Sequence, residues 1–441
     1  MPEVTLSQML DAREERVQLQ KKLLTDYPCP LVCFTMNIAG PVKNSPVIER
    51  GFRFGITELE SSIAPELVRC RKVDILPTGC QAMISVDMDA KDLKEICVAI
   101  EDKNCLGRLF DMDVIDIDGK KIERSTLRGC IICGAPGRAC AAGRIHPVDE
   151  LQAATNKIIT EHFAEADAER FASCAVESLL NEVNTTPKPG LVDRRNSGSH
   201  KDMDINTFIK SALALKPYFK KCVCIGQQTK DISSGEVFPL LRSAGILAEK
   251  DMFRETDGIN THKGVIYSMG ILCAALGRLW TVEVPVAKAE DILNQCSEIA
   301  DAAVKSDFSS IDDSTAGGRL YKQMGITGIR GEVASGFASV TRISLPAYRN
   351  ALQKGLSQND AGANALLHLI SWVEDTNLYQ RGGADGASYA KDRVRSLLKS
   401  HPFPSEEQIE LLDNDFISKN LSPGGCADLL AITYFIHSLY M

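Results

Sequence analysis

Residues 184–204, NTTPKPGLVDRRNSGSHKDMD, form a polar stretch between two segments with helical apolar spacing. The stretch contains three carboxylates, four cations, one histidine, two prolines and two glycines. Because Pro and Gly mark turns and Asn, Asp and Ser cap helices, one interpretation is an ordinary connection between two helices. The density of charge favours a more specific role.

The segments on both sides of this stretch, and most of the chain after it, have the periodicity of helices. Before it, Phe171, Cys174, Ala175, Leu179 and Leu180 fall on one helical face. Similar apolar stripes occur at residues 265–280, 286–304, 364–375 and 426–441. We therefore predict an all-helical domain over residues 165–441.

The first part of the chain mixes helical and strand periods. Two segments have helical spacing, 6–24 and 90–102, and three are typical of strands bounded by turn residues: 30–38, 80–89 and 109–118. We predict a mixed α/β domain over residues 1–160, with the junction between the domains at 147–168. The expected fold is thus multi-domain, with the larger, all-α domain second.

The composition limits the possible functions. The chain has 441 residues, 44% of them hydrophobic, and a formal net charge of -8. A negative surface disfavours nonspecific binding to nucleic acid, although it leaves room for a local basic pocket. The sequence has no run approaching the roughly 18 apolar residues that a membrane span requires. We expect a cytoplasmic protein that binds neither nucleic acid nor membrane.

Four potential metal ligands cluster in one short segment. Cys130, Cys133 and Cys140 lie in RGCIICGAPGRAC, and His146 follows in GRIHP. A CxxC knuckle with one further Cys and one His supplies enough ligands for structural zinc. The alternative is a Gly-rich turn with free thiols, and the tight spacing after the knuckle favours this alternative. The other cysteines are expected to be reduced and mostly buried.

Two carboxylates of the α/β part share one face of a predicted strand. Asp111 and Asp113 are two residues apart in GRLFDMDVID, so both side chains project to the same side. Such a pair suits an oxygen-ligated Mg²⁺ at a phosphoryl-transfer site, with Asp87 or Asp116 as a third carboxylate. A polar sheet face near a turn would explain it too. In NIAGPVKNSP, Asn37 and Lys43 are candidates for phosphate or pantetheine contacts, or simply part of a turn.

Six polar loops of the helical part combine glycine with charged or amide residues. They are 184–204, 256–264, 314–321, 325–336, 374–386 and 420–430. Helix N-termini bind phosphate through free N–H groups, and glycine lets a ligand approach the backbone. Each loop residue taken singly is better explained as a cap, a turn or part of a local ion pair. The recurrence of the pattern favours one shared anionic site that uses Mg²⁺.

These loops carry a family resemblance. SLLNEVNTTPKPGLVDRRNSGSHKDMD, GINTHKG, GITGIRGEVASGF, DTNLYQRGG and NLSPGGCADLLAITYF together resemble the triphosphoribosyl-dephospho-coenzyme A synthase family over about residues 165–441. The first half, with LDAREERVQLQKKLL, CFTMNIAGPVKNSP, LPTGCQAM and LGRLFDMDVID, looks like apo-citrate lyase phosphoribosyl-dephospho-coenzyme A transferase. Both halves in one chain resemble the fused bifunctional form that matures citrate lyase.

The resemblance implies two reactions and their substrates. In the helical domain, dephospho-coenzyme A would displace adenine from ATP and retain the triphosphate. In the N-terminal domain, which would be nucleotidyltransferase-like, a serine of the citrate lyase acyl carrier (gamma) subunit would then displace pyrophosphate. Mg²⁺ is the expected cofactor, held by Asp111, Asp113 and Asp202. Alternatives are a nucleotide or ADP-ribose hydrolase and a non-catalytic coenzyme A-binding scaffold.

The two reactions require particular residue types, which indicate the candidate residues. An oxocarbenium-like centre calls for carboxylates, and the candidates in the helical domain are Glu182, Asp193, Asp202, Glu332 and Asp375. The triphosphate calls for cations, with Lys188 and Arg194 the first choices. The candidate substrate contacts of this domain are Lys188, Gly190, Arg194, Asn196, Ser197, His200, His262, Lys263, Arg330, Arg381, Gly382, Gly383, Gly424 and Gly425.

Overall fold

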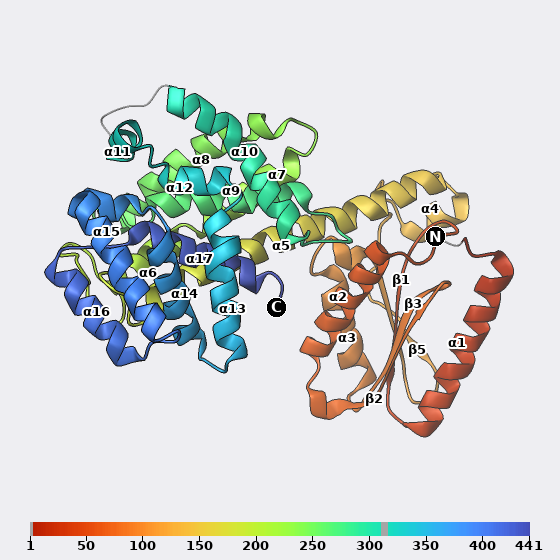
Figure 1. Ribbon diagram of the computed structural model, residues 1–441. Coiled ribbons are helices and arrows are strands. Elements are labelled where there is room, and N and C mark those ends of the chain that lie inside the picture. Colours follow the sequence, from red (N-terminus) through yellow and green to blue (C-terminus); the bar gives the residue numbers. More distant parts are fainter. Residues whose placement is uncertain (1–2, 310–315) are drawn as a thin grey trace. The chain divides into compact units, whose positions relative to one another are not determined.

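The computed structural model describes residues 3–309 and 316–441 (Figure 1). Residues 314 and 315 of the predicted loop at 314–321 therefore lie outside the described residues. The chain divides into two compact units, Met1–Glu165 and Ala166–Met441. The division falls inside one long helix, α5 (Val148–Asn184).

The N-terminal unit is built on an antiparallel sheet. Its described strands are β1 (Leu31–Met36), β2 (Val68–Leu76), β3 (Gly79–Val86), β4 (Phe110–Ile115) and β5 (Lys121–Ile122). Their order across the sheet is β2-β3-β1-β4-β5, and all neighbours are antiparallel. The three strands predicted from sequence correspond to β1, β3 and β4, the centre of the sheet. The edge strands β2 and β5 were not predicted.

Helices cover both faces of this sheet (Figure 1). The α-helices of this unit before α5 are α1 (Leu6–Asp26), α2 (Pro46–Ser62), α3 (Ala90–Asp102) and α4 (Gly137–Gly143), and its described 3₁₀-helices are η1 (Pro65–Leu67) and η2 (Leu106–Leu109). On the face covered by α2 and α3, Phe34 stacks on Phe52 at 4.9 Å and meets the edge of Phe110 at 5.2 Å. On the opposite face, Leu23 of α1 packs against Leu31, Cys33 and Met83. The sheet is therefore buried on both sides at its centre.

Local sequence signals set where these helices begin. Thr5 and Gln8 form a capping box at the start of α1. Ser45 accepts a hydrogen bond from the N–H of Ile48 at the start of α2, and Asp89 caps α3 in the same way. The side-chain oxygens satisfy backbone N–H groups that have no partner within the first helical turn.

The C-terminal unit is helical throughout its described residues, apart from loops. After α5 come α6 (Ile205–Ala214), α7 (Lys216–Gln228), α8 (Ser234–Glu255), α9 (Lys263–Leu279), α10 (Ala289–Ser309), α11 (Ala316–Met324), α12 (Gly328–Ala334), the π-helix η3 (Val340–Ser344), α13 (Leu345–Gln353), α14 (Gln358–Trp372), α15 (Thr376–Ser400), α16 (Glu406–Ser418) and α17 (Gly424–Ser438). The expectation of an α/β part followed by a larger helical part is confirmed.

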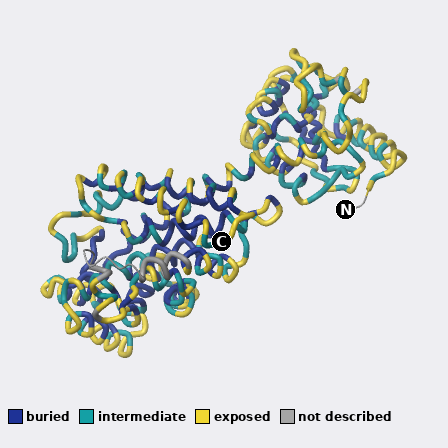
Figure 2. The backbone as a smooth tube through the Cα atoms, turned by 90° about the horizontal axis from the view of Figure 1, so that it is seen from above, coloured by how far each residue is buried: buried dark blue, intermediate teal, exposed yellow. Residues whose placement is uncertain are grey.

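Three helices lie at the centre of this unit. The helices α9, α14 and α17 are buried along most of their length. Figure 2 shows the buried parts of the backbone in dark blue. A helix that is apolar on nearly all sides must be surrounded by other helices. Here α7, α8, α10 and α12 pack around α9, and η3, α13 and α15 pack against α14. None of the helices in the described ranges is long and apolar enough to cross a lipid bilayer.

Candidate active sites

A charged site lies on the face of the N-terminal sheet that α1 covers. Asp111 and Asp113 share that face of β4, as predicted from their spacing. Across the sheet, Thr35 of β1 stands between Asp111 and Gln81 of β3. Arg16 of α1 donates to Gln81 Oε1 through Nε at 2.9 Å. The sheet and α1 thus bring residues from three distant segments to one place.

Two carboxylates and two cations meet at this site, Asp111 and Asp113 with Arg16 and Lys121. Lys121 Nζ lies 2.6 Å from Asp113 Oδ2. Solvent still reaches Asp111, but the surrounding protein desolvates its carboxylate, and this effect and the negative charge of Asp113 raise the pKa of Asp111. The two neighbouring carboxylates supply the oxygen ligands that Mg²⁺ prefers.

The other predicted residues of this unit have local roles. Asn37 is exposed and follows β1, where its N–H donates to the carbonyl of Leu109. Lys43 Nζ donates to the carbonyl of Ile38 at 2.6 Å, which stabilises the turn after β1. The two proposed third carboxylates have other partners. Asp87 pairs with Arg69, and Asp116 Oδ1 accepts hydrogen bonds from the N–H groups of its own turn. The sequence reasoning missed Arg16, Gln81 and Lys121.

The four potential zinc ligands come together in space. The ligand atoms of Cys130, Cys133, Cys140 and His146 all lie within 4.8 Å of one another. Cys133 Sγ and Cys140 Sγ are 3.4 Å apart.

The C-terminal unit contains a cavity of about 450 Å³ where the ends of several helices meet. Segments from five of the six predicted loops contribute to its wall. The predicted residues that line it are Glu182, Lys188, His200, Asp202, His262, Lys263, Glu332, Asp375, Arg381, Gly424 and Gly425. Five of the six loops thus meet at one cavity, and its use as an anionic site that holds Mg²⁺ stays a prediction.

One wall of the cavity is acidic and buried. Glu182, Asp375 and Asp428 all line it, and burial raises the pKa of each carboxyl group. The pKa of Asp428 is raised further by the charges of the other two. Asp428 Oδ2 occupies the space where a side chain at position 264 would lie, so the glycine there admits this carboxylate to the first turn of α9.

Asp375 also has a structural role. It is both a helix cap and a residue of the cavity wall. Its Oδ1 accepts from the N–H groups of Asn377 and Leu378 at the start of α15, and its Oδ2 accepts from the N–H of Cys426 in α17. It therefore holds two helix N-termini at the cavity wall.

Lys188 is the buried cation of the cavity. It is only 1% exposed, and its Nζ lies 2.5 Å from Glu182 Oε1 and 2.8 Å from the Glu182 carbonyl. A buried ion pair of this kind is strongly destabilised when one partner is removed.

Two neutral histidines present ring nitrogens at the cavity wall. Thr261 donates to Ser211 Oγ, and Ser211 Oγ lies 2.7 Å from His262 Nδ1. In the tautomer in which Ser211 donates to Nδ1, the proton of His262 is on Nε2, which is buried and has no hydrogen-bond partner among the described residues. Burial, reinforced by Lys188, lowers the pKa of His262 to about 3.

His200 is oriented by hydrogen bonds on both sides. Arg381 Nη2 donates to its Nδ1 at 3.1 Å, so its Nε2 donates to Ser422 Oγ at 2.9 Å. Burial and the charge of Arg381 lower the pKa of His200 to about 4. Arg381 also donates to the carbonyl of Ser199 and thereby fixes the loop at the cavity edge.

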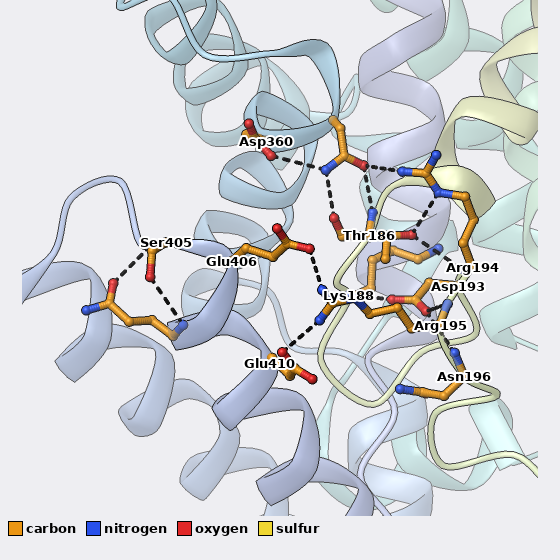
Figure 3. Close-up of polar contacts among 12 residues, drawn as sticks. Thr186, Lys188, Asp193, Arg194, Arg195, Asn196, Asp360, Ser405, Glu406 and Glu410 are labelled. Atoms are coloured by element: carbon orange, nitrogen blue, oxygen red, sulfur yellow. Dashed lines mark hydrogen bonds and ion pairs between the residues drawn. The ribbon is translucent and has the colours of Figure 1, made fainter.

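Much of the 184–204 loop is scaffold (Figure 3). Asp193 accepts hydrogen bonds from the N–H groups of Lys188, Arg195 and Asn196. Arg195 pairs with Glu406 and Glu410 of α16, while Arg194 donates to Thr186 Oγ1 and to Asn359 Oδ1.

Several predicted residues of the C-terminal unit, all of them described, are not part of the cavity wall. They are Asp193, Gly190, Arg194, Asn196, Ser197, Arg330, Gly382 and Gly383. The sequence does not separate them from their neighbours, because in a charged loop the same residue types both build the loop and contact a ligand.

The sequence reasoning also passed over two carboxylates, Asp413 and Asp428, the second of which lies inside the predicted loop 420–430. Asp413 accepts from Gly190 N–H and from Asn196 Nδ2, so it anchors the 184–204 loop from α16. Asp428 is the first charged residue in the otherwise apolar run of α17. A carboxylate in such a run is itself a signal, since it must face a partner or a cavity.

Two charged sites on two separate compact units define a two-domain enzyme. The family model of apo-citrate lyase phosphoribosyl-dephospho-CoA transferase, CitX, matches residues 4–162. The model of ATP:dephospho-CoA triphosphoribosyl transferase, CitG, matches residues 168–441. The chain belongs to the fused CitXG family of citrate lyase maturation proteins. It is a bifunctional transferase that synthesises and attaches the citrate lyase prosthetic group.

Curated relatives match either the whole chain or its second unit. "Protein CitXG" of Haemophilus influenzae is 34% identical, covering 99% of this chain and 96% of the relative. "Protein CitXG" of Leuconostoc mesenteroides subsp. cremoris is 32% identical, covering 99% of this chain and 97% of the relative. The probable 2-(5''-triphosphoribosyl)-3'-dephosphocoenzyme-A synthase of Citrobacter koseri is 41% identical over 60% of this chain and 89% of its own length.

Proposed function

We propose that the two reactions are divided between the two charged sites. In the C-terminal cavity, the ribose 2′-oxygen of 3′-dephospho-CoA bonds to C1′ of the ATP ribose, the C1′–N9 bond breaks, and adenine leaves with a proton. At the N-terminal site, a serine oxygen of the citrate lyase acyl carrier subunit bonds to the α-phosphorus, and pyrophosphate leaves. ATP and dephospho-CoA are the small-molecule substrates, and the acyl carrier is the protein partner.

The observation that carries the first assignment is the buried acidic wall formed by Glu182, Asp375 and Asp428. Displacement at C1′ of a ribose develops positive charge at the ring, as in glycoside hydrolysis. Carboxylates held away from water stabilise such charge more strongly than carboxylates in solvent. Asp428 suits this role best, because Glu182 already pairs with Lys188 and Asp375 already caps two helices.

Donors on the rest of the wall suit the other parts of ATP. His262 Nε2–H, which no described residue accepts, would donate to an acceptor nitrogen of the departing adenine. The cations of the wall are Lys188, Lys263 and Arg381. Lys188 pairs with Glu182 and Lys263 with Glu249, so Arg381 would be the first of them to contact the triphosphate. The free N–H groups at the start of α17, beside Gly424 and Gly425, would add further phosphate contacts.

We propose Mg²⁺ at both sites, because both have the oxygen donors that it prefers. Asp111 and Asp113 would hold it in the N-terminal unit. In the cavity, Asp202, exposed at the edge, would hold it on the triphosphate. Desolvation and, after it, the negative charge of Asp113 raise the pKa of Asp111, and a bound cation would offset that charge. When bound, Mg²⁺ neutralises the phosphate oxygens.

The N-terminal unit would act as a nucleotidyltransferase. Its Asp111 and Asp113 project from a central strand, with Arg16 and Lys121 close by to contact phosphate. The chain itself need only position the carrier serine in line with the α-phosphorus and the leaving pyrophosphate.

Two measurements test this division. The first is adenine release from ATP with and without dephospho-CoA. Release that needs the acceptor supports the synthase assignment, whereas release without it supports a hydrolase and no release supports a non-catalytic scaffold. The second is mass spectrometry of the acyl carrier subunit after incubation with the preformed triphosphoribosyl intermediate. An unmodified serine would overturn the transferase assignment.

A further inference from the structure

The Cys/His cluster of the N-terminal unit takes no part in the proposed reactions. Its four residues lie in the segment between β5 and α5, and their ligand atoms are all within 4.8 Å of one another. A tetrahedral zinc ion with Zn–S bonds of about 2.3 Å and a Zn–N bond of about 2.0 Å places its ligand atoms roughly 3.5 to 3.8 Å apart. The cluster therefore needs only small side-chain adjustments to enclose a zinc ion.

The backbone around Cys130 has the form of a metal-binding knuckle. The Ile132 N–H donates to Cys130 Sγ at 3.4 Å, and the Gly134 N–H donates to the Cys130 carbonyl at 3.0 Å. Gly134 has a φ of 73°, which reverses the chain directly after Cys133. An N–H group that points at a cysteine sulfur stabilises that sulfur as a thiolate, which is the form that binds metal.

His146 provides an independent indication of a ligand. Its Nδ1 lies 3.7 Å from Glu150 Oε2. Its Nε2 is buried and has no hydrogen-bond partner in the described part of the chain. In metal sites, a histidine ligand commonly directs its other ring nitrogen to a carboxylate, which fixes the ring orientation. The Glu150–His146 pair has this arrangement and leaves Nε2 for the metal.

We propose that Cys130, Cys133, Cys140 and His146 bind one structural Zn²⁺ ion. The sequence spacing alone favoured a Gly-rich turn with free thiols, but such a turn explains neither the convergence of all four residues nor the buried nitrogen of His146. A disulfide between Cys133 and Cys140, whose sulfurs are 3.4 Å apart, would leave Cys130 and His146 unused. Three thiolates and one imidazole complete a tetrahedral zinc site.

The position of the segment shows what the zinc ion would stabilise. Arg108 Nη2 donates to the Gly129 carbonyl at 2.9 Å, and Arg128 Nη2 donates to the Gly107 carbonyl at 3.1 Å. Arg128 also donates to the carbonyl of Phe110, the first residue of β4. The segment is thus bonded to the chain that leads into Asp111. Zinc would close the segment on itself and keep it packed against the start of β4.

The test is the metal content of the purified full chain. After dialysis under reducing conditions, we expect one zinc ion per chain by inductively coupled plasma mass spectrometry. The zinc content of the double variant C133S/C140S should be about tenfold lower than that of the unsubstituted chain, or lower still. The matched control is C105S, which removes an exposed thiol of the same unit outside the cluster and should retain the metal.

Cobalt spectroscopy keeps the test valid if the double variant misfolds. Co²⁺ added to the zinc-stripped full chain should give the intense visible bands of a tetrahedral thiolate site, and H146Q should weaken and shift them. The proposal fails if the unsubstituted chain neither contains zinc nor gives these bands. It also fails if C133S/C140S folds and keeps its zinc, or if Cys133 and Cys140 are found as a disulfide in chain prepared with reductant.

Discussion

The two units present their charged groups to solvent in opposite ways. In the N-terminal unit, Asp111 is exposed and the side chain of Asp113 is 31% exposed. In the C-terminal unit, Glu182, Lys188 and Asp375 are at most 5% exposed. Under the proposed division of reactions, the open site accepts a serine on another protein, whereas the buried charges of the cavity act on two small molecules. The accessibility of each site thus agrees with the size of its proposed acceptor.

The difference follows from how each fold positions side chains. A strand presents alternate residues to one sheet face, and that face stays open wherever α1 does not cover it. Helix ends that converge instead enclose a space, because their loops close it on several sides. Electrostatic interactions in such an enclosed space are stronger than at a surface, where water and salt screen them. The buried site therefore depends more on each single charge.

The largest expected effect is the loss of one activity without the other when the N-terminal carboxylates are removed. The double variant D111A/D113A should lower carrier modification by about 1,000-fold or more, because it removes both carboxylates proposed to hold Mg²⁺. Adenine release should stay within about twofold of the unsubstituted chain, since that reaction belongs to the other unit. Both are measured on one preparation, by mass spectrometry of the carrier and by adenine chromatography. Loss of both activities, or of neither, contradicts the division.

The second effect concerns the acidic wall of the cavity. D428N should lower adenine release by about 100-fold, because it removes the carboxylate proposed to face C1′. Modification of the carrier from preformed intermediate should be unchanged. The Tm at pH 8 should not fall, because Asp428 is buried beside the carboxylates of Glu182 and Asp375, which repel it.

The matched control for D428N is D415N. Asp415 lies on α16, where it accepts from Tyr389 and pairs with Lys419. The substitution makes the same chemical change outside the cavity wall and should leave adenine release unaltered. Equal activity losses in D428N and D415N would contradict the role proposed for Asp428.

The third effect is a pH dependence of the free energy of unfolding, which comes from the burial of His262 as a neutral ring. The pKa of His262 is about 3 in the folded chain, against about 6.5 for an unfolded histidine. Between these values the unfolded chain binds a proton that the folded chain does not, so His262 reduces stability as pH falls below about 6.5. The slope is at most about 1.4 kcal/mol per pH unit.

This contribution is measured as a difference between variants. H262Q lacks the buried histidine and therefore this pH-dependent loss. In urea unfolding from pH 8 to pH 5, the free energy of unfolding of H262Q relative to that of the unsubstituted chain should rise below about pH 6.5. H401Q, which replaces an exposed histidine of the same unit, controls for the loss of an imidazole. Parallel curves for H262Q and the unsubstituted chain would show that His262 is not buried as a neutral ring.

The sequence predicted elements where one physical signal dominated. The helical half is set by apolar stripes, and α9, α14 and α17 appear where these stripes are strongest. The edge strand β2, VRCRKVDIL, was missed because four of its nine residues are charged, as suits a strand with one unpaired edge. Strand β5 has only two residues, too few for any period to show.

The site was less predictable because it depends on contacts between distant segments. Strand alternation was enough to place Asp111 and Asp113 together, but Arg16 and Gln81 join them only through the packing of α1 on the sheet. In the cavity, loop composition nominated Lys188 and Arg194 equally. Lys188 faces inward onto Glu182, six residues away, whereas Arg194 is held by Thr186 and by Asn359 of α14, a distant contact that nothing near Arg194 in the sequence encodes.

The smallest expected effect is a change in the KM for ATP, and it tests which arginine of the charged loops faces the cavity. Arg194 and Arg381 are both arginines of the charged loops, but Arg194 is exposed and donates to Thr186 and Asn359, whereas Arg381 lines the cavity beside His200. R194M should change the KM for ATP in adenine release by less than about threefold, the range of a surface contact. R381M should raise it by about tenfold, because a charge-assisted contact to phosphate is lost. If R194M raises the KM as much as R381M, the 184–204 loop must turn Arg194 inward when ATP binds, and the contacts of Figure 3 then describe only the unliganded loop.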